Sequence, residues 1–474
     1  MNTFNKKSLY AAVAGLSALG VTGAAQAVSV NPDGLGQALV YPYYTVRDAS
    51  AGAPYNSLLS VVNSTASAKA VKVRFLEGKN SREVLDFNLY LSPKDVWTAA
   101  VIPTADGAGM FTADKSCTTP SFASTTASAP QLFVNYAYSG SNDDGAGTTL
   151  DRTREGYIEI IEMGNVTGAT ATAVTHVSGV PPCGSLPNAS ADTVVGNGGL
   201  FGGITLINVA AGTDFSEDAV ALDAFSATPL WNPPGSILPN LANVNPKVSV
   251  VTTGTSTFIT DWSASGNPAD PVSAVLMHNN VYNEFVLDAA TKSGTDWVVT
   301  MPTKNFYYSG TTVTKLFQRN FTSGGACDDV QITLYDREER TVVSSTIVSP
   351  PPPTSTDSIC WEANVISFNG TNVFGSKNLT PIPTTFQNGW AALNFNGSTV
   401  AGLAGVHTLQ GGASTLFSTA TGATTTLATT TFNGLPVVGF AAQSFNNGSL
   451  TVGGASVLSN YGGNFVHKTT RSIQ

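Results

Sequence analysis

Apolar and polar residues alternate with a period of two along much of the chain. The clearest run alternates three apolar positions with two basic ones: Val71, Lys72, Val73, Arg74 and Phe75. Such a period is typical of a half-buried β-strand. Similar runs recur at intervals of about ten residues, separated by Gly, Asn or Pro turns: Ser57–Val62, Glu83–Leu91, Val96–Ile102, Tyr157–Met163 and Ile204–Val209. The sequence therefore predicts a mainly β protein of tandem β-sandwich modules of the immunoglobulin-like kind, with long loops and few short helices.

Two later segments add to this prediction. Asp214–Phe225 is the best candidate for a helix. Further on, the strand-like runs Val330–Tyr335 and Trp361–Phe368 flank Ser349–Pro353, whose prolines cannot donate the hydrogen bonds of a central strand. The proline run is therefore either the stiff tip of a long hairpin or a linker between domains.

The first 27 residues have the layout of a secretory signal peptide. Lys6 and Lys7 precede the uncharged run Leu9–Val21, and Ala25 and Ala27 are small residues at the positions that a signal peptidase recognises. The uncharged run is shorter than the about 20 residues of a spanning helix, and no later stretch reaches that length without interruption. We expect cleavage after Ala27 and a secreted or cell-surface location in a Gram-negative bacterium.

Charged residues are scarce. They make up 11% of the chain, against about 25% in an average soluble domain. The formal net charge of −9 disfavours nucleic acid as a partner, because binding to phosphates needs clustered Lys and Arg. From Ala363 to Val466 the one charged residue is Lys377. Such a surface has little charge repulsion to keep copies apart, which favours self-association.

Four cysteines remain after the expected cleavage: Cys117, Cys183, Cys327 and Cys360. An even number in an exported chain predicts disulfides. Of the three possible pairings, the sequential one, 117 with 183 and 327 with 360, is favoured because each bridge then closes a loop within one module. A zinc site is the alternative, but the spacing lacks a Cys-x-x-Cys pair and clustered histidines.

No catalytic residue is assigned. The acidic pair Asp336 and Glu338 would share a face of a strand, as the carboxyl groups of a glycosidase must converge, but a solvated strand end explains the pair equally. Calcium is the only cofactor that the sequence suggests, with Asp143 and Asp144 as weak candidate ligands. Turn chemistry beside Gly145 explains these two residues as well.

Two aromatic clusters are candidates for stacking on a ligand such as a sugar. They contain Tyr41, Tyr43, Tyr44, Tyr307 and Tyr308. Core packing or an interface is the alternative use of such clusters.

Three segments together resemble a family of secreted, surface-layer-like cell-surface proteins of proteobacteria. They are Asn56–Asn63 (NSLLSVVN), Phe75–Phe87 (FLEGKNSREVLDF) and Asn460–Lys468 (NYGGNFVHK). The start of the mature chain is also similar to the immunoglobulin-like sandwiches of bacterial surface proteins. The resemblance implies a surface location but no activity, so no site residue follows from it.

These observations divide the chain into four parts. Residues 1–27 are the signal peptide, 28–110 an immunoglobulin-like sandwich, 111–325 a β-rich region with irregular insertions, and 326–474 a β-rich, charge-poor region. The favoured function is a structural or interaction protein of the cell envelope, whose partner is itself or a surface polysaccharide. An adhesin or carbohydrate-binding protein is the second hypothesis, and a secreted hydrolase is the third.

Overall fold

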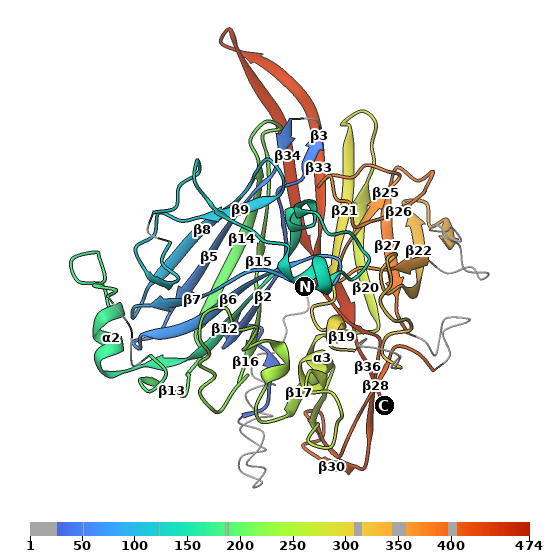
Figure 1. Cartoon of the computed structure of the whole chain (residues 1–474). Coiled ribbons are helices and arrows are strands. Elements are labelled where there is room, and N and C mark those ends of the chain that lie inside the picture. Colours follow the sequence, from blue (N-terminus) through green and yellow to red (C-terminus); the bar gives the residue numbers. More distant parts are fainter. Residues whose placement is uncertain are drawn as a thin grey trace.

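The computed structural model describes residues 26–50, 52–122, 124–184, 186, 189–307, 315–343, 357–396 and 405–474. Two β-sandwich modules lie side by side, with a long hairpin projecting from one end (Figure 1). The mainly β fold with sandwich modules is confirmed. The expected signal peptide, except for its last two residues, and the proline run at 349–353 lie outside the described residues.

The first module contains an 8-stranded and a 6-stranded sheet. The first sheet has the order β1 (Ser29–Val30), β16 (Val220–Asp223), β2 (Ala38–Thr45), β12 (Glu155–Val166), β6 (Lys69–Glu77), β7 (Glu83–Leu91) and β10 (Cys117–Thr119), with β13 (Thr193–Val194) beside β12. The second has the order β11 (Gln131–Leu132), β9 (Ala108–Phe111), β8 (Val96–Pro103), β5 (Asn56–Asn63), β14 (Leu200–Asn208) and β15 (Thr213–Asp218). The alternating apolar residues of both sheets, such as Val73 and Val61, meet in one core. These sheets are larger than those of an immunoglobulin domain, which has seven to nine strands in all.

The second module contains a 6-stranded and a 5-stranded sheet. One has the order β23 (Thr341–Val343), β22 (Asp328–Asp336), β27 (Asn388–Asn394), β20 (Asn280–Val286) and β35 (Lys468–Thr470), with β24 (Asp357–Ile359) beside β22. The other has the order β26 (Leu379–Ile382), β25 (Ala363–Phe368), β21 (Ser293–Thr300), β33 (Val438–Val452) and β34 (Ala455–Val466). The predicted strands at 330–335 and 361–368 are present, but they lie in different sheets. β22 forms a hairpin with β23 and also pairs with β24, next to Cys360.

Small sheets and short helices close the ends of the modules. The sheets are β17 (Val248–Thr253), β18 (Ser256–Asp261), β29 (Ser414–Ser418) and β30 (Thr424–Leu427); β28 (Thr408–Gly411), β31 (Thr430–Asn433) and β36 (Ser472–Ile473); β19 (Met277–His278) with β32 (Leu435–Pro436); and β3 (Asp48–Ser50) with β4 (Ala53–Pro54). The helices are α2 (Gly168–Val174) and α3 (Asp270–Leu276), with 3-10 turns η2 (Tyr136–Tyr138), η3 (Gly140–Asn142), η4 (Leu150–Arg154), η5 (Leu241–Asn243) and η6 (Lys304–Phe306). Within the described residues, no helix is both long and apolar enough to cross a membrane.

The two modules share one sheet between their cores. On β21, Trp297 and Val299 point into the core of the second module, whereas Val298 between them belongs to the core of the first. On the neighbouring strand β33, Ala441 belongs to the core of the second module and Phe440 to the core of the first. This sheet is therefore buried on both faces. The two modules pack against each other and are not separate domains joined by a linker.

The expected boundary at residue 110 does not separate two bodies in the structure. β2 and β6 lie on either side of β12, and β5 pairs with β14. Both sheets of the first module thus combine strands from before and after residue 110, and this module extends to Asp223 in β16.

Two local predictions were wrong. The candidate helix at 214–225 forms β15 and β16, because its backbone pairs with β14 on one side and with β2 on the other. β6 has the predicted alternation, but it is buried on both faces rather than half-buried. Lys72 is covered by a distant loop, whose Pro233 carbonyl lies 3.3 Å from Lys72 Nζ, and Arg74 pairs with Glu83 and Glu159.

Candidate interaction surfaces

The sequential pairing of the cysteines is confirmed. Cys117 is bonded to Cys183 and Cys327 to Cys360. The first bridge ties the end of β10 to the loop after α2, and the second closes the β22–β24 pair. Among the described residues no cysteine is free, so these side chains serve as covalent ties and not as ligands.

The tyrosines proposed to stack on a ligand lie in the core. Tyr41, Tyr43 and Tyr44 are 0% exposed, and burial raises the pKa of all three hydroxyls. Tyr41 donates to the Ser60 carbonyl at 2.7 Å, and Tyr43 to Glu155 Oε2 at 2.9 Å. A stacking role for these rings is therefore wrong, because no ring face reaches solvent.

The second aromatic cluster is also internal. Tyr307 is 5% exposed and donates to Asp270 Oδ1 at 2.7 Å. It packs against Phe317 at a ring distance of 5.3 Å. Tyr307 is thus a core residue and not a stacking platform, while Tyr308 lies outside the described residues.

The acidic pair of the hydrolase hypothesis does not converge on a cleft. Asp336 ends β22 and accepts hydrogen bonds from the backbone N–H groups of Glu338 at 3.0 Å and Arg340 at 2.8 Å. The Glu338 side chain is 59% exposed and faces Arg337 and Arg340. The two carboxyl groups belong to a solvated turn, which gives no support to a hydrolase.

The calcium candidates have other partners. Asp143 Oδ1 accepts the Gly145 N–H at 2.8 Å, which is the chemistry of a turn. Asp144 forms an ion pair with Arg152 at 2.7 Å; burial opposes ionisation, but Arg152 and Asn80 hold the pKa of Asp144 below its usual value. The described residues contain no cluster of His, Cys, Asp or Glu that could hold a metal ion.

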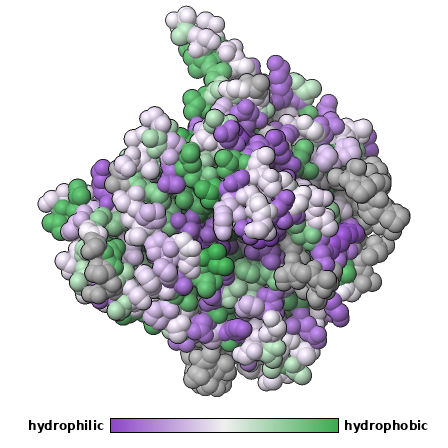
Figure 2. Space-filling view, viewed as in Figure 1, coloured by the Kyte–Doolittle hydropathy of each residue, from purple (hydrophilic) through white to green (hydrophobic). Residues whose placement is uncertain are grey.

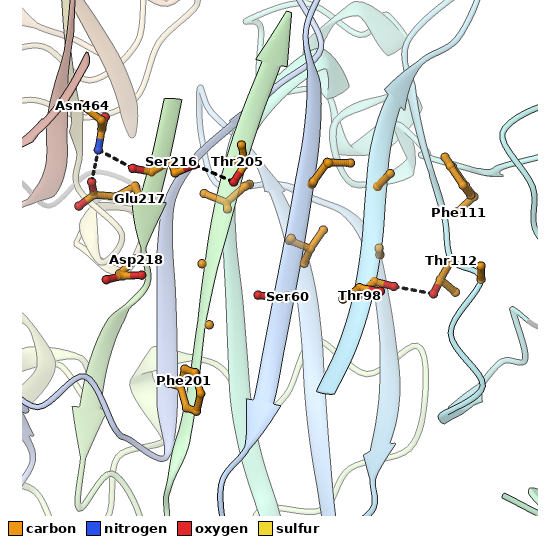
Figure 3. A pocket seen from close by; sticks show the side chains of 18 of the residues that line it. Ser60, Thr98, Phe111, Thr112, Phe201, Thr205, Ser216, Glu217, Asp218 and Asn464 are labelled. Carbon is orange, nitrogen blue, oxygen red and sulfur yellow. Dashed lines mark hydrogen bonds between the residues drawn. The ribbon is translucent and has the colours of Figure 1, made fainter. Parts of the chain in front are cut away.

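A groove runs along the outer face of the 6-stranded sheet in the first module (Figure 3). Its volume is about 880 Å³. Small residues form most of its floor, with large apolar residues among and around them: the small ones are Ser60, Thr98, Gly202, Gly203 and Thr205, and the large ones are Leu58, Phe111, Phe201 and Val466. Phe201 and Leu58 are each 42% exposed and Val466 is 59% exposed. The groove is therefore apolar and open.

One edge of the groove carries the carboxyl group of Glu217. Burial, with a contribution from Asp218, raises the pKa of Glu217 to about 7, although a hydrogen bond from Asn464 opposes the shift. Asn464 Nδ2 donates to Glu217 Oε2 at 2.5 Å and to the Ser216 carbonyl at 2.7 Å. Asp218 lines the same edge, and β34 from the second module, through Asn464 and Val466, forms the rim of the groove.

The projecting hairpin carries an apolar face without a partner. Beyond Phe445, the last residue of β33 that pairs with β21, the strands β33 and β34 pair only with each other. We call residues 449–458 the ribbon. Because the partners are Leu450 with Val457 and Val452 with Ala455, these four residues share one face. Leu450, Val452 and Val457 are 57%, 62% and 47% exposed, and apolar residues are seen along the projection and near its base (Figure 2).

A third surface lies on the outer face of β20, β27 and β22. Trp390 is 41% exposed, the only exposed tryptophan in the chain, all six tryptophans being among the described residues. Its ring stacks on Tyr335 at a centroid distance of 4.0 Å and lies 6.3 Å from Tyr282. Four residues further along β27, Asn394 is flanked by Asn280 on β20 and Gln331 on β22. Aromatic rings beside a row of amides offer both apolar contact and hydrogen bonds.

The sequence contained signals for the ribbon and for the surface at Trp390, two of these three surfaces. Ser449 to Val452 alternate polar and apolar residues, and Gly453-Gly454 is a hairpin turn signal. Tyr335 ends the predicted strand 330–335, whereas no strand was predicted around Trp390, and only the pairing of β27 with β22 brings the two rings together.

Comparisons with protein-family models, with curated proteins and with solved structures find no match to this chain.

Proposed function

We propose that the chain is a structural or interaction protein of the bacterial cell envelope, a surface-layer-like or matrix subunit that associates with copies of itself. The observation that carries this proposal is the ribbon. A two-stranded ribbon is marginally stable alone in water, and its unpaired edges and apolar face favour association. The ribbon has no Asp, Glu, Lys or Arg to oppose that contact.

The groove of a second copy is the partner surface that fits the ribbon. Larger side chains on the ribbon, Leu450, Val452 and Val457, meet a floor of Gly, Ser and Thr, as two packed sheets require. The ribbon does not reach the groove of its own copy, because Val457 is nine residues along β34 from Val466 at the rim, or about 30 Å. It also points away from the body (Figure 1).

The proposed contact joins two different surfaces, the ribbon of one copy and the groove of the next. A ribbon that enters the groove of the next copy leaves that copy's ribbon free for a third. Such heterologous contacts extend into filaments or lattices unless the rotation closes a ring. This open-ended geometry suits a layer or matrix subunit.

Export belongs to the same proposal. The signal peptide expected at 1–27 would deliver the chain to an oxidising compartment, where disulfides such as Cys117–Cys183 persist. Cleavage after Ala27 would leave Val28, which is buried and whose amide donates to the Val248 carbonyl at 2.9 Å. The resemblance to secreted proteobacterial surface proteins supports the same location.

Sedimentation of the mature protein, Val28–Gln474, over a wide concentration range tests self-association. We expect the average mass to rise with concentration, and Val457→Asp to weaken association by about tenfold or more, because a charge would be buried in an apolar contact. The matched control is Ser456→Asp, which adds the same charge to the opposite face of the same strand. A chain that stays monomeric at high concentration, with and without calcium, would contradict the proposal.

A mixing experiment tests the head-to-tail geometry. Thr98→Trp fills the groove but leaves the ribbon intact. Val457→Asp disables the ribbon but leaves the groove open. Each variant alone should fail to associate, and an equimolar mixture should form dimers and nothing larger. Equal behaviour of the mixture and the separate variants would show that the ribbon does not bind the groove.

Carbohydrate binding is a second candidate, favoured by the exposed Trp390 with Tyr335 and the neighbouring amide row. We expect retention on an envelope polysaccharide or a glycan array, with Trp390→Ala reducing it by about tenfold or more. Phe201→Ala, which removes an aromatic ring of similar exposure from the groove, is the control. No retention of the wild-type protein by any glycan would remove this candidate.

A further inference from the structure

A lysine and an aspartate face each other in the core of the second module, out of contact with solvent. Lys304 in η6 and Asp328 at the start of β22 are both 0% exposed. Lys304 Nζ lies 2.8 Å from Asp328 Oδ2, yet the angles of this contact are not those of a hydrogen bond. A buried ion pair needs well-directed hydrogen bonds to offset its desolvation, and neither Lys304 Nζ nor Asp328 Oδ2 makes one within the described residues.

The first module contains a buried ion pair, Lys69 and Glu162, whose lysine makes several hydrogen bonds. Lys69 Nζ lies 2.5 Å from Glu162 Oε1 and also donates to Asn165 at 3.0 Å and to Asn197 at 2.6 Å. Three oxygen acceptors thus surround that amino group. Lys304 Nζ instead lies 5.6 Å from the ring centroid of Phe317 and has no hydrogen-bond partner within the described residues. The two lysines are equally buried but differ in their polar surroundings.

The other oxygen of Asp328 faces donors. Oδ1 accepts the backbone N–H of Gln318 at 2.8 Å and lies 3.7 Å from Nε2 of His407, which is also 0% exposed. His407 Nδ1 lies 3.0 Å from the Phe395 carbonyl, which can only accept, so Nδ1 carries a hydrogen; Nε2 is a donor toward Oδ1 when it carries a hydrogen as well. Donors aimed at one oxygen stabilise negative charge that develops there.

We propose that Lys304 and Asp328 condense within the folded chain to form an amide cross-link between Nζ and Cγ, with His407 assisting. Nζ already lies in contact with the carboxyl group that it would attack, which is the positioning that an intramolecular reaction needs. The cross-link replaces two buried charges by one neutral amide. It does not depend on the function proposed above.

The condensation balances without any other reactant. Burial raises the pKa of Asp328, but Lys304 and His407 outweigh burial and hold the pKa below its usual value, so Asp328 starts as the carboxylate of the ion pair with Lys304. Nζ passes one proton to Oδ2 and attacks Cγ, and negative charge gathers on Oδ1 beside Gln318 N–H and His407. Nζ then gives a second proton to Oδ2, the Cγ–Oδ2 bond breaks, and one water molecule leaves.

A tryptic digest of the reduced and alkylated wild-type protein tests the proposal. An amidated Lys304 is no longer a cleavage site, so we expect one branched peptide made of residues 293–315 and 320–337. Its mass should be the sum of the two peptides minus one water, and fragmentation should assign the branch to Lys304 and Asp328. Separate linear peptides that end at Lys304 and span 320–337 in unmodified form would overturn the proposal.

Variants separate the cross-link from a merely structural ion pair. Lys304→Arg keeps the charge but cannot form the amide, so the branched peptide should vanish. Lys69→Arg, the matched control, should leave it unchanged. In His407→Asn the rate of cross-linking after a pulse of synthesis should fall by about tenfold or more, and an unchanged rate would remove His407 from the reaction. The wild-type digest decides the proposal even if a variant fails to fold.

Discussion

Asp296 lies on β21, between the two cores, and it is 0% exposed. It accepts the Phe374 N–H at 3.1 Å, but its Oδ1 has no hydrogen-bond partner among the described residues. Burial raises the pKa of Asp296 to about 7, although hydrogen bonds from Phe374, Ser367 and Val373 oppose the shift. The carboxyl group therefore prefers its neutral form in the folded protein.

This preference predicts a stability that depends on pH. Because the folded state binds the Asp296 proton more tightly than the unfolded state, the free energy of unfolding should fall as pH rises from about 4 to about 7. Asp296→Asn should remove this dependence and stabilise the protein at pH 8 by about 2–4 kcal/mol. Urea unfolding at several pH values measures both effects. If the variant and the wild type show the same pH dependence, Asp296 is ionised in the folded state.

At the scale of the element, β6 has two charged side chains on a face that never meets water. Arg74 Nη1 lies 2.6 Å from Glu159 and its Nε 2.7 Å from Glu83. Lys72 lies 2.7 Å from Asp86 and contacts the loop at Pro233. Lys72 and Arg74 thus serve as partners in internal cross-strand ion pairs.

Arg74 can be removed to test this arrangement. Arg74→Met leaves Glu159 buried without its cation, so the free energy of unfolding should fall by about 3–5 kcal/mol. Adding Glu159→Leu should recover much of the loss, since a buried pair replaced by apolar residues is often nearly neutral. Arg337→Met, at a side chain that is 66% exposed, should change stability by about 0.5 kcal/mol or less. Equal effects of the Arg74 and Arg337 variants in urea unfolding would contradict the buried pairing.

These elements explain what could be predicted from sequence. The period of two correctly assigned Val71, Val73 and Phe75 to one face of β6, because alternation is a property of the strand itself. The cover over Lys72 could not be foreseen, because it comes from a loop about 160 residues away. For the same reason the segment 214–225 was misassigned as a helix: pairing with β14 and β2, both distant in sequence, overrides local preference.

At the scale of the molecule, pairing between strands that are distant in sequence determines the boundaries of the modules and which residues form each surface. The disulfides could be predicted because cysteine chemistry and loop closure limit the choices. The tyrosines at 41, 43 and 44 could not be recognised as internal, because the strands that cover them start near residues 56 and 155. The groove is equally invisible in the sequence, since residues near 60, 98, 202 and 464 form it.

The shared sheet predicts that the two modules unfold together. Phe374 follows β25 in the second half of the chain, yet it is 0% exposed in the core of the first module. Its ring lies 5.3 Å from Phe215 and 5.5 Å from Tyr43, and 6.1 Å from Phe440 on β33. The ring therefore joins strands of both modules, and neither core is complete without the other.

Phe374→Ala tests this coupling. Loss of a fully buried ring should lower the free energy of unfolding by about 3–5 kcal/mol, and calorimetry should show one transition at a lower temperature. Phe417→Ala, at a half-buried ring on the small sheet of β29, should have a smaller effect. Two separate transitions, of which only one moves in the Phe374 variant, would show instead that the modules fold independently. A single shifted transition follows if the sheet of β21, β25 and β33 belongs to both cores, because a cavity on either face then weakens the whole molecule.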